Sequence, residues 1–145
     1  MKKIIRKSIT VEVMFHETDL LGIAHNSVHF KWFEQGWMAI MEDIIPISEA
    51  IGQGFSPVVI RNTCEYCKPA RFKDVMILTT RMPIPAVYEG KFVFFHELTN
   101  KSTLETIATG ESWLTLIDLK TYKLLKEIPK PIQARIKNRL LAEGE

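Results

Sequence analysis

The chain has 145 residues, of which 46% are hydrophobic and 25% are charged, and its formal net charge is +2. These values fit one globular domain over residues 1–145 and do not suggest a nucleic-acid-binding protein, which usually carries a clustered basic face. No apolar run approaches the ~18 residues of a membrane-spanning helix or forms a signal peptide, so a cytoplasmic protein without a membrane partner is expected.

A half-buried strand is the first element expected, over residues 5–15. Its odd-numbered positions are mostly apolar and the positions between them are polar, which is the period of two that a strand with one buried face shows. The apolar set is Ile5, Ile9, Val11, Val13 and Phe15.

A long helix is expected next, from Asn26 to Ile45, where Pro46 ends it. At about 100° per residue the polar side chains fall in one narrow stripe and nearly all others are apolar, which predicts a helix that the rest of the fold wraps. Gly36 lies opposite the stripe and costs about 1 kcal/mol relative to alanine in a helix. The expected compensation is a close approach of a sheet to the helix backbone at that position.

The remainder of the chain is rich in β-branched and aromatic residues, interrupted by turn residues. Four strands are expected, over residues 58–68, 74–82, 91–99 and 103–119, with turns at Pro69, Pro83–Pro85, Asn100–Lys101 and Asp118–Thr121. A short helix is expected from Pro131, with Ile132, Ile136 and Leu140 on one side.

The predicted fold class is α+β, with an antiparallel sheet wrapped around one long central helix and a short C-terminal helix. A sheet that curls round a single helix solves the burial problem for both elements. One helix cannot cover both faces of the sheet, so the outer face or an edge is expected to meet another subunit.

Cys64 and Cys67 raise the question of metal or redox chemistry. They lie three residues apart in a predicted strand, where side chains alternate between the two faces. Because the two thiols would point to opposite sides, free thiols are expected and no metal site is predicted.

The connection between the first strand and the helix reads HETDLLGIAHN, residues 16–26. A helix start offers unpaired N–H groups and the positive end of the helix dipole, which suit a developing oxyanion. Asn26 or Ser27 is the expected N-cap, and Gly22 permits a turn that a side chain would obstruct. Asp19 lies a few residues before the helix and is expected to face a carbonyl bound there.

A carboxylate and a helix-start oxyanion hole suit the cleavage of a thioester. The thiol leaves as a thiolate with a pKa of ~8.5, so little acid assistance is needed. Asp19 would activate water as a general base or attack the carbonyl carbon directly. The same two groups would be too few for a peptidase, which must also protonate a poor leaving group.

The segment TDLLGIAHNSVHFKWFE, residues 18–34, resembles the signature T-D-x-x-G-(V/I)-V-x-H-x-x-Y of the 4-hydroxybenzoyl-CoA thioesterase family of hotdog-fold acyl-CoA thioesterases. The similarity continues through residues 56–78 and resumes at 91–120, so it covers most of the chain. The resemblance implies a hotdog fold and hydrolysis of acyl-CoA or acyl-carrier-protein thioesters. It also implies a homodimer, often paired into a homotetramer, with no metal or redox cofactor and with coenzyme A only as part of the substrate.

Carried over by this resemblance, Asp19 matches the catalytic carboxylate, and Asn26 takes the position whose backbone N–H polarises the thioester carbonyl. Four positions depart from the family pattern. Family members commonly have Val, Tyr, His and Tyr where this chain has Ala24, His25, Asn26 and His29. These departures leave the reaction class in place and leave the preferred acyl group open.

Alternative roles accompany several of these residues. Asp19 also suits an Asx turn without catalysis. Glu17 is the rival carboxylate, for which a structural role is favoured. His25 is a candidate substrate contact and equally a cap of the helix start. His29 is expected to form part of the pocket wall or a subunit contact.

Coenzyme A carries phosphates, so basic residues are expected along its path. The candidates are Lys68, Arg71 and Lys73, which follow the second strand, with ordinary solvated charges as the alternative for each. Two other functions remain open on the same scaffold: a non-catalytic acyl-thioester-binding module, and a dehydratase or hydratase.

Overall fold

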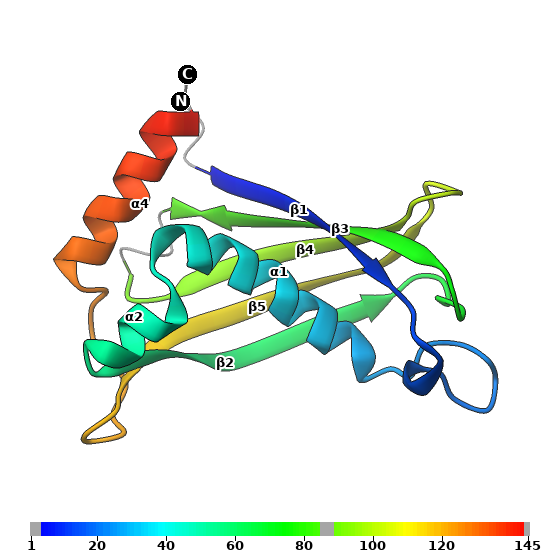
Figure 1. Cartoon of the computed structure of the whole chain (residues 1–145), viewed down its shortest axis with the longest axis horizontal. Coiled ribbons are helices and arrows are strands. Elements are labelled where there is room, and N and C mark those ends of the chain that lie inside the picture. The colour runs from blue at the N-terminus through cyan, green and yellow to red at the C-terminus, as the bar shows by residue number, and fades with distance from the viewer. Residues whose placement is uncertain (1–3, 85–88, 144–145) are drawn as a thin grey trace.

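The structure is a computed structural model that describes residues 4–84 and 89–143 (Figure 1). In chain order the elements are β1 (Ile4–Glu12), the 3-10 helix η1 (Phe15–Glu17), α1 (Val28–Ile44), α2 (Ile47–Gly52), β2 (Phe55–Tyr66), β3 (Val75–Pro83), β4 (Phe92–Asn100), β5 (Thr106–Asp118) and α4 (Lys130–Glu143).

The strands form one five-stranded sheet in the order β1-β3-β4-β5-β2, and each strand pairs antiparallel with its neighbours. The sheet curls around α1, and α4 lies across the end of the molecule that also carries α2 (Figure 1). This arrangement confirms the predicted sheet wrapped around one central helix, with a further helix at the C-terminal end.

Helix α1 is buried on most of its surface, as the sequence predicts. Its buried positions are Val28, His29, Trp32, Phe33, Gly36, Trp37, Ile40, Met41 and Ile44. The exposed positions include Lys31, Glu34, Gln35 and Glu42, which are members of the predicted polar stripe. The helix ends at Ile44 because the residue before a proline avoids helical backbone angles, and Ile45 is extended (φ −148°, ψ 114°) ahead of Pro46.

Gly36 lies where α1 approaches the sheet most closely. A Cβ atom at this position would lie 2.7 Å from Leu78 Cδ2 and would also meet the Thr80 hydroxyl. The predicted close approach of sheet and helix is therefore confirmed, and it explains why glycine is retained inside a buried helix.

Two apolar clusters form the core, one toward each end of α1. The first joins the second half of α1, including Trp37 and Met41, to Ile132 and Ile136 of α4. The second joins the first half of α1, including Trp32, to Val13 and Ala70. The start of α1, where the connection from β1 arrives, thus belongs to the second cluster.

Several boundaries differ from the sequence predictions. β1 ends at Glu12, and Phe15 lies in η1 and is 75% exposed. α2 was not predicted, and Pro57 lies inside β2, which tolerates it as an edge strand. The turn predicted at Pro85 falls outside the described residues. No helix in the described part of the chain is both long and apolar enough to cross a membrane.

Candidate active site

The segment between β1 and α1 is fixed by backbone hydrogen bonds rather than left as a free loop. Thr18 and Ala24 form an antiparallel bridge, and Ile23 forms another with Arg71 from the β2–β3 connection. The Ala24 N–H also donates to the Ala70 carbonyl at 2.7 Å. The segment therefore turns back on itself and is attached to the β2–β3 connection before α1 begins.

Asp19 stands at the start of the turn within this segment. The Gly22 N–H donates to the Asp19 carbonyl at 3.0 Å, and the Asp19 N–H donates to the Ile23 carbonyl at 2.9 Å. The Leu21 N–H donates to Asp19 Oδ1 at 2.8 Å, while Gly22 takes the positive φ of 74° that the turn requires. The Asx turn uses one carboxylate oxygen and leaves the other without a partner among the described residues. Asp19 can therefore form the turn with one carboxylate oxygen and act on a substrate with the other.

The two peptides that flank Asn26 are held at three of their four polar groups. The His25 carbonyl accepts from Val28 N–H at 3.0 Å, the Ser27 N–H donates to His25 Nδ1 at 3.2 Å, and the Asn26 carbonyl accepts from the Tyr66 hydroxyl. The remaining group is the Asn26 N–H, which has no partner within the described part of the chain. In a trans peptide this N–H points opposite to the His25 carbonyl and hence away from Val28.

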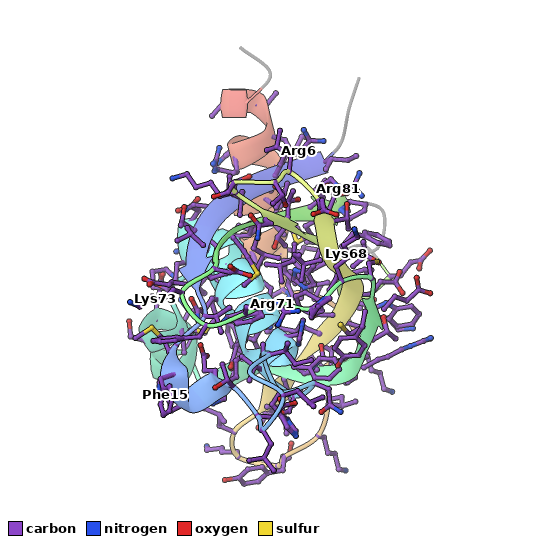
Figure 2. The ribbon with its side chains drawn as sticks, turned by 90° about the vertical axis from the view of Figure 1, so that its right-hand side faces the viewer. Arg6, Phe15, Lys68, Arg71, Lys73 and Arg81 are labelled. Carbon is purple, nitrogen blue, oxygen red and sulfur yellow. The ribbon has the colours of Figure 1, made fainter. Side chains whose placement is uncertain are left out.

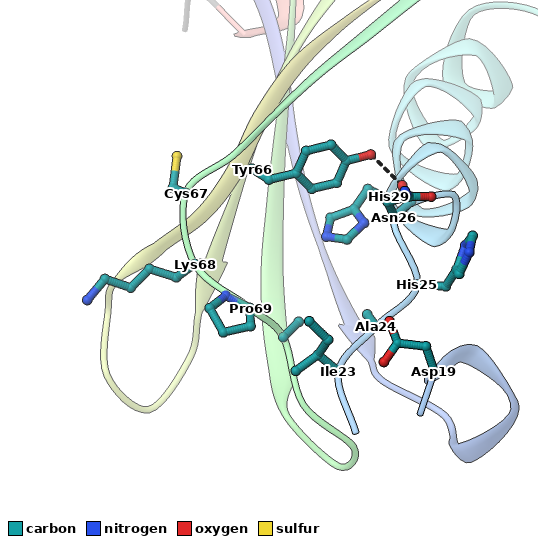
Figure 3. A pocket seen from close by; sticks show the side chains of 11 residues that line it. Asp19, Ile23, Ala24, His25, Asn26, His29, Tyr66, Cys67, Lys68 and Pro69 are labelled. Atoms are coloured by element: carbon teal, nitrogen blue, oxygen red, sulfur yellow. Dashed lines mark hydrogen bonds between the residues drawn. The ribbon is translucent and has the colours of Figure 1, made fainter. Parts of the chain in front are cut away.

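A pocket of about 550 Å³ brings these groups together. It is lined by Asp19, residues 23–26, His29 and residues 66–70, so it lies between the start of α1 and the β2–β3 connection. Figure 3 shows the Asp19 carboxylate pointing into this space, on the same side as the segment that leads to Asn26. The helix start and the carboxylate therefore face one cavity, as the sequence argument requires.

His29 forms the buried polar part of the wall. Only 4% of it is exposed, and its ring makes edge contacts with Trp32 and Tyr66, at centroid distances of 5.1 and 4.7 Å. Burial lowers the pKa of His29, and the nearby carbonyls of Asn26 and His25 oppose that effect only in part. The imidazole is accordingly neutral near pH 7.

The sequence profile of the thioesterase-like superfamily matches residues 13–136. The chain belongs to the thioesterase-like superfamily. The match spans the site segment, α1 and the four strands β2 to β5, and it begins just after β1. It confirms the family resemblance carried by residues 18–34.

One protein of similar sequence and two solved structures of similar fold fit this assignment. A protein of Aquifex aeolicus (strain VF5) named "Putative esterase" is 36% identical over 64 residues, and the match covers 43% of this chain and 50% of that protein. The chain thus spans about half the length of this curated relative. A DHNA-CoA thioesterase structure from Staphylococcus aureus has a TM-score of 0.81 at 19% identity, covering 97% of this chain and 95% of that one.

A second Staphylococcus aureus structure, determined in complex with CoA, has a TM-score of 0.78 at 15% identity, covering 95% of this chain and 85% of that one. At such identities the similarity establishes the fold, which is the hotdog fold that the sequence predicts.

The three basic candidates of the thioesterase-like protein lie at one end of the molecule, with Arg71 between Lys73 and Lys68 in the view of Figure 2. Lys68 lines the pocket but is ion-paired with Glu105. Lys73 lies over the ring of Phe72, with Nζ 5.6 Å from its centroid. Arg71 and Lys73 are exposed, and no ion pair engages either side chain within the described residues. These two cations are thus not engaged by a carboxylate, but neither lines the pocket, whereas Lys68 does.

His25 and Glu17 both stabilise the local backbone. His25 Nδ1 accepts from the Ser27 N–H, so the ring caps the helix start, although His25 also lines the pocket. Glu17 Oε1 accepts from the Met14 N–H at 2.8 Å, which closes η1. Glu17 is not among the pocket-lining residues, in keeping with the structural role favoured for it.

Both cysteines are free thiols, and burial raises the pKa of Cys64. Nowhere in residues 4–84 and 89–143 do three or more His, Cys, Asp or Glu side chains form a group that could hold a metal ion.

Tyr66 is a pocket residue that the sequence analysis does not predict. It is the last residue of β2, 40 positions from Asn26, so only the tertiary fold brings the two together.

Proposed function

We propose that the protein hydrolyses acyl-CoA thioesters to a free acid and coenzyme A. The observation that carries this proposal is the joint placement of the Asp19 carboxylate and the unpartnered Asn26 N–H on one pocket at the start of α1. Membership of the thioesterase-like superfamily supports the reaction class.

In the proposed reaction the thioester carbonyl oxygen accepts a hydrogen bond from the Asn26 N–H. The positive end of the α1 dipole adds to the stabilisation of the oxyanion as the carbonyl carbon becomes tetrahedral. Asp19 takes a proton from a water molecule, whose oxygen bonds to that carbon. The C–S bond then breaks, and the leaving thiolate is protonated to give the free thiol.

A direct attack by Asp19 is the second route to the same products. The free carboxylate oxygen would bond to the carbonyl carbon, expel the thiolate and leave a mixed anhydride for water to cleave. Both routes use the same two groups.

The coenzyme A end of the substrate is expected beside the pocket, where the β2–β3 connection carries two exposed basic residues that do not themselves line it. We infer that Arg71 and Lys73 contact its phosphates, since both are exposed and not engaged by a carboxylate in the described residues. One similar structure is that of a DHNA-CoA thioesterase and another was determined with CoA, which supports a CoA thioester as the substrate.

Self-association as a homodimer or homotetramer stays a prediction. The edge strand β2, with Val59 and Ile60 exposed in the single chain, is compatible with it.

The test is thiol release from a panel of acyl-CoA substrates by the wild type and by Asp19→Asn. We expect the substitution to lower kcat about 100-fold or more without loss of the fold, since the amide cannot accept a proton from water. Asp118→Asn is a matched control, because the Asp118 carboxylate also caps a turn, accepting from Lys120 and Thr121 N–H groups outside the pocket.

Equal rates for Asp19→Asn and the wild type would remove Asp19 from the mechanism. Tight binding of acyl-CoA with no thiol release by the wild type would instead identify an acyl-thioester-binding module.

A further inference from the structure

Lys68 supplies the only lysine or arginine side chain among the described residues that line the pocket. Its backbone is fixed, because the Lys68 N–H donates to the Ile107 carbonyl at 3.1 Å and the Cys67 N–H donates to the same carbonyl at 2.9 Å. The side chain nevertheless leads outward, away from His25 and Asp19 (Figure 3). The positive charge of Lys68 thus starts from the pocket wall but does not point into the pocket.

Glu105 accounts for this direction. It lies in the connection between β4 and β5, and its carboxylate forms an ion pair with the Lys68 ammonium. The Asn100 N–H donates to the Glu105 carbonyl at 2.9 Å, and the Glu105 N–H donates to Thr103 Oγ1 at 3.3 Å, so the backbone of Glu105 is held in its turn. The Lys68 ammonium lowers the pKa of Glu105, and the carboxylate is therefore charged at neutral pH.

The ion pair between Lys68 and Glu105 is exposed enough to exchange partners. The side chain of Lys68 is 56% exposed and that of Glu105 is 45% exposed. Exposed ion pairs contribute little to stability, because water solvates the separated charges almost as well. A lysine ammonium turns on a flexible four-carbon stem and binds a phosphate as a point charge. A phosphate beside the pocket can therefore replace Glu105 as the partner of Lys68.

We propose that Glu105 limits the affinity of the site for coenzyme A by competing with its phosphates for Lys68. In the free protein Glu105 holds the Lys68 ammonium away from the pocket, and on binding the ammonium passes from the carboxylate to a phosphate. The affinity for coenzyme A then reflects the difference between two ion pairs. Since coenzyme A is also the product of the proposed reaction, this competition favours its release.

The competition acts on Lys68 alone among the three basic candidates. No ion pair engages Arg71 or Lys73 within the described residues, so neither has a carboxylate to give up. The inference rests on the proposed function only in taking a coenzyme A thioester as the ligand.

Calorimetric titration with coenzyme A, and with pantetheine, which lacks its phosphates, tests this role. We expect Glu105→Gln to bind coenzyme A about threefold to fivefold more tightly than the wild type, since the competing charge is gone. Its affinity for pantetheine should be unchanged. Lys68→Met should weaken coenzyme A binding, and Glu105→Gln added to Lys68→Met should have no further effect.

Glu65→Gln is the matched control. Glu65 is an exposed carboxylate near the end of β2, three residues before Lys68, and no ion pair engages it in the part of the chain that the structure describes. It should bind coenzyme A as the wild type does. Equal tightening in Glu65→Gln and Glu105→Gln would mean general repulsion of an anionic ligand and would overturn the proposal.

Two further outcomes would also overturn it. Pantetheine binding that tightens as much as coenzyme A binding would mean that Glu105 merely ties two connections together. Tightening by Glu105→Gln that persists in the Lys68→Met background would mean that Lys68 is not the group for which the carboxylate competes.

The titrations do not depend on turnover, so they separate this role from the proposed hydrolysis. Tighter coenzyme A binding by Glu105→Gln, without thiol release from any acyl-CoA by the wild type, would refute hydrolysis and leave the role of Glu105 standing. Thiol release by the wild type with unchanged coenzyme A affinity in Glu105→Gln would overturn the role of Glu105. A lack of coenzyme A binding by both proteins would overturn it as well.

Discussion

Tyr66 joins the two sides of the pocket through one hydrogen bond. Its hydroxyl donates to the Asn26 carbonyl, and its ring packs edge-on against His29. The hydroxyl thereby fixes the peptide on one side of Asn26, while Val28 fixes the other by donating to His25. An oxyanion donor is effective when it is oriented before the substrate arrives, so this contact bears on catalysis.

Tyr66→Phe should lower kcat about fivefold to tenfold and leave KM within about twofold. The change removes one hydrogen bond, worth about 1 kcal/mol, from the residue that orients the Asn26 N–H. Steady-state kinetics with the best acyl-CoA substrate measure both constants. Tyr122→Phe is the matched control, because Tyr122 is 74% exposed and lies between β5 and α4, outside the pocket lining. A raised KM with unchanged kcat would show that Tyr66 serves binding instead.

The candidate site divides into a part that the sequence predicts and a part that it does not. Asp19, Gly22 and Asn26 lie within one short segment, so their joint role follows from local chemistry and from the family signature. Tyr66 comes from a strand 40 residues away, and its contact depends on the register between β2 and β5. The burial of His29 against Tyr66 likewise follows only from packing, because the two residues lie on different elements.

At the level of elements, the contact between α1 and the sheet is set by the absence of a side chain. A Cβ at Gly36 would meet the Thr80 hydroxyl and Leu78 Cδ2, and would lie 3.4 Å from His96 Nδ1. The space that a Cβ atom would need is therefore occupied by side-chain atoms of the sheet, which are packed in the core and have little freedom to move. Helix propensity favours alanine here by about 1 kcal/mol, but the close contact opposes it.

Gly36→Ala should destabilise the protein by about 1–3 kcal/mol, because steric overlap in a packed core outweighs the gain in helix propensity. Chemical denaturation followed by circular dichroism measures the free energy of unfolding. Gly52→Ala is the matched control, since a Cβ at Gly52 of α2 would have no heavy atom within 4 Å. A stabilised Gly36→Ala variant would mean that α1 moves away from the sheet at little cost.

The periodicity of the sequence predicts the long elements well and the short ones poorly. The apolar pattern of α1 and the alternation along β3 and β4 reflect burial, which repeats over many residues. The helix α2, of 6 residues, and η1, of 3 residues, are too short to show a period. Phe15 continues the alternation of β1 in sequence, yet its backbone belongs to η1 and its ring meets Phe72. Local tertiary contacts determine the backbone conformation of such short segments.

Across the whole molecule, a polar row separates the two apolar clusters of the core. His96 hydrogen-bonds Thr80 through Nδ1 and Ser112 through Nε2, each at 2.9 Å, so the row crosses β3, β4 and β5. The ring of Phe33 stacks on His96 at a centroid distance of 4.4 Å, and Gly36 of α1 lies above the row. Every polar atom of the imidazole is satisfied, and its environment favours the uncharged form.

Burial lowers the pKa of His96 to about 3, from the value of 6.5 expected in an unfolded chain. Between these two pH values the unfolded state binds the proton and the folded state does not, so the free energy of unfolding falls as the solution is acidified. The full contribution is present above pH 6.5 and is lost progressively toward pH 3. A shift of this size corresponds to about 5 kcal/mol over the whole interval.

His96→Gln should therefore flatten the dependence of stability on pH between about 6.5 and 4, although it lowers stability at neutral pH through lost packing on Phe33. Urea denaturation at a series of pH values gives the slope for the wild type and the variant. His16→Gln removes an exposed histidine and serves as the control, with the wild-type slope expected. Parallel slopes for the wild type and His96→Gln would mean that His96 gains its proton without unfolding, and that the polar row tolerates a charge inside the core.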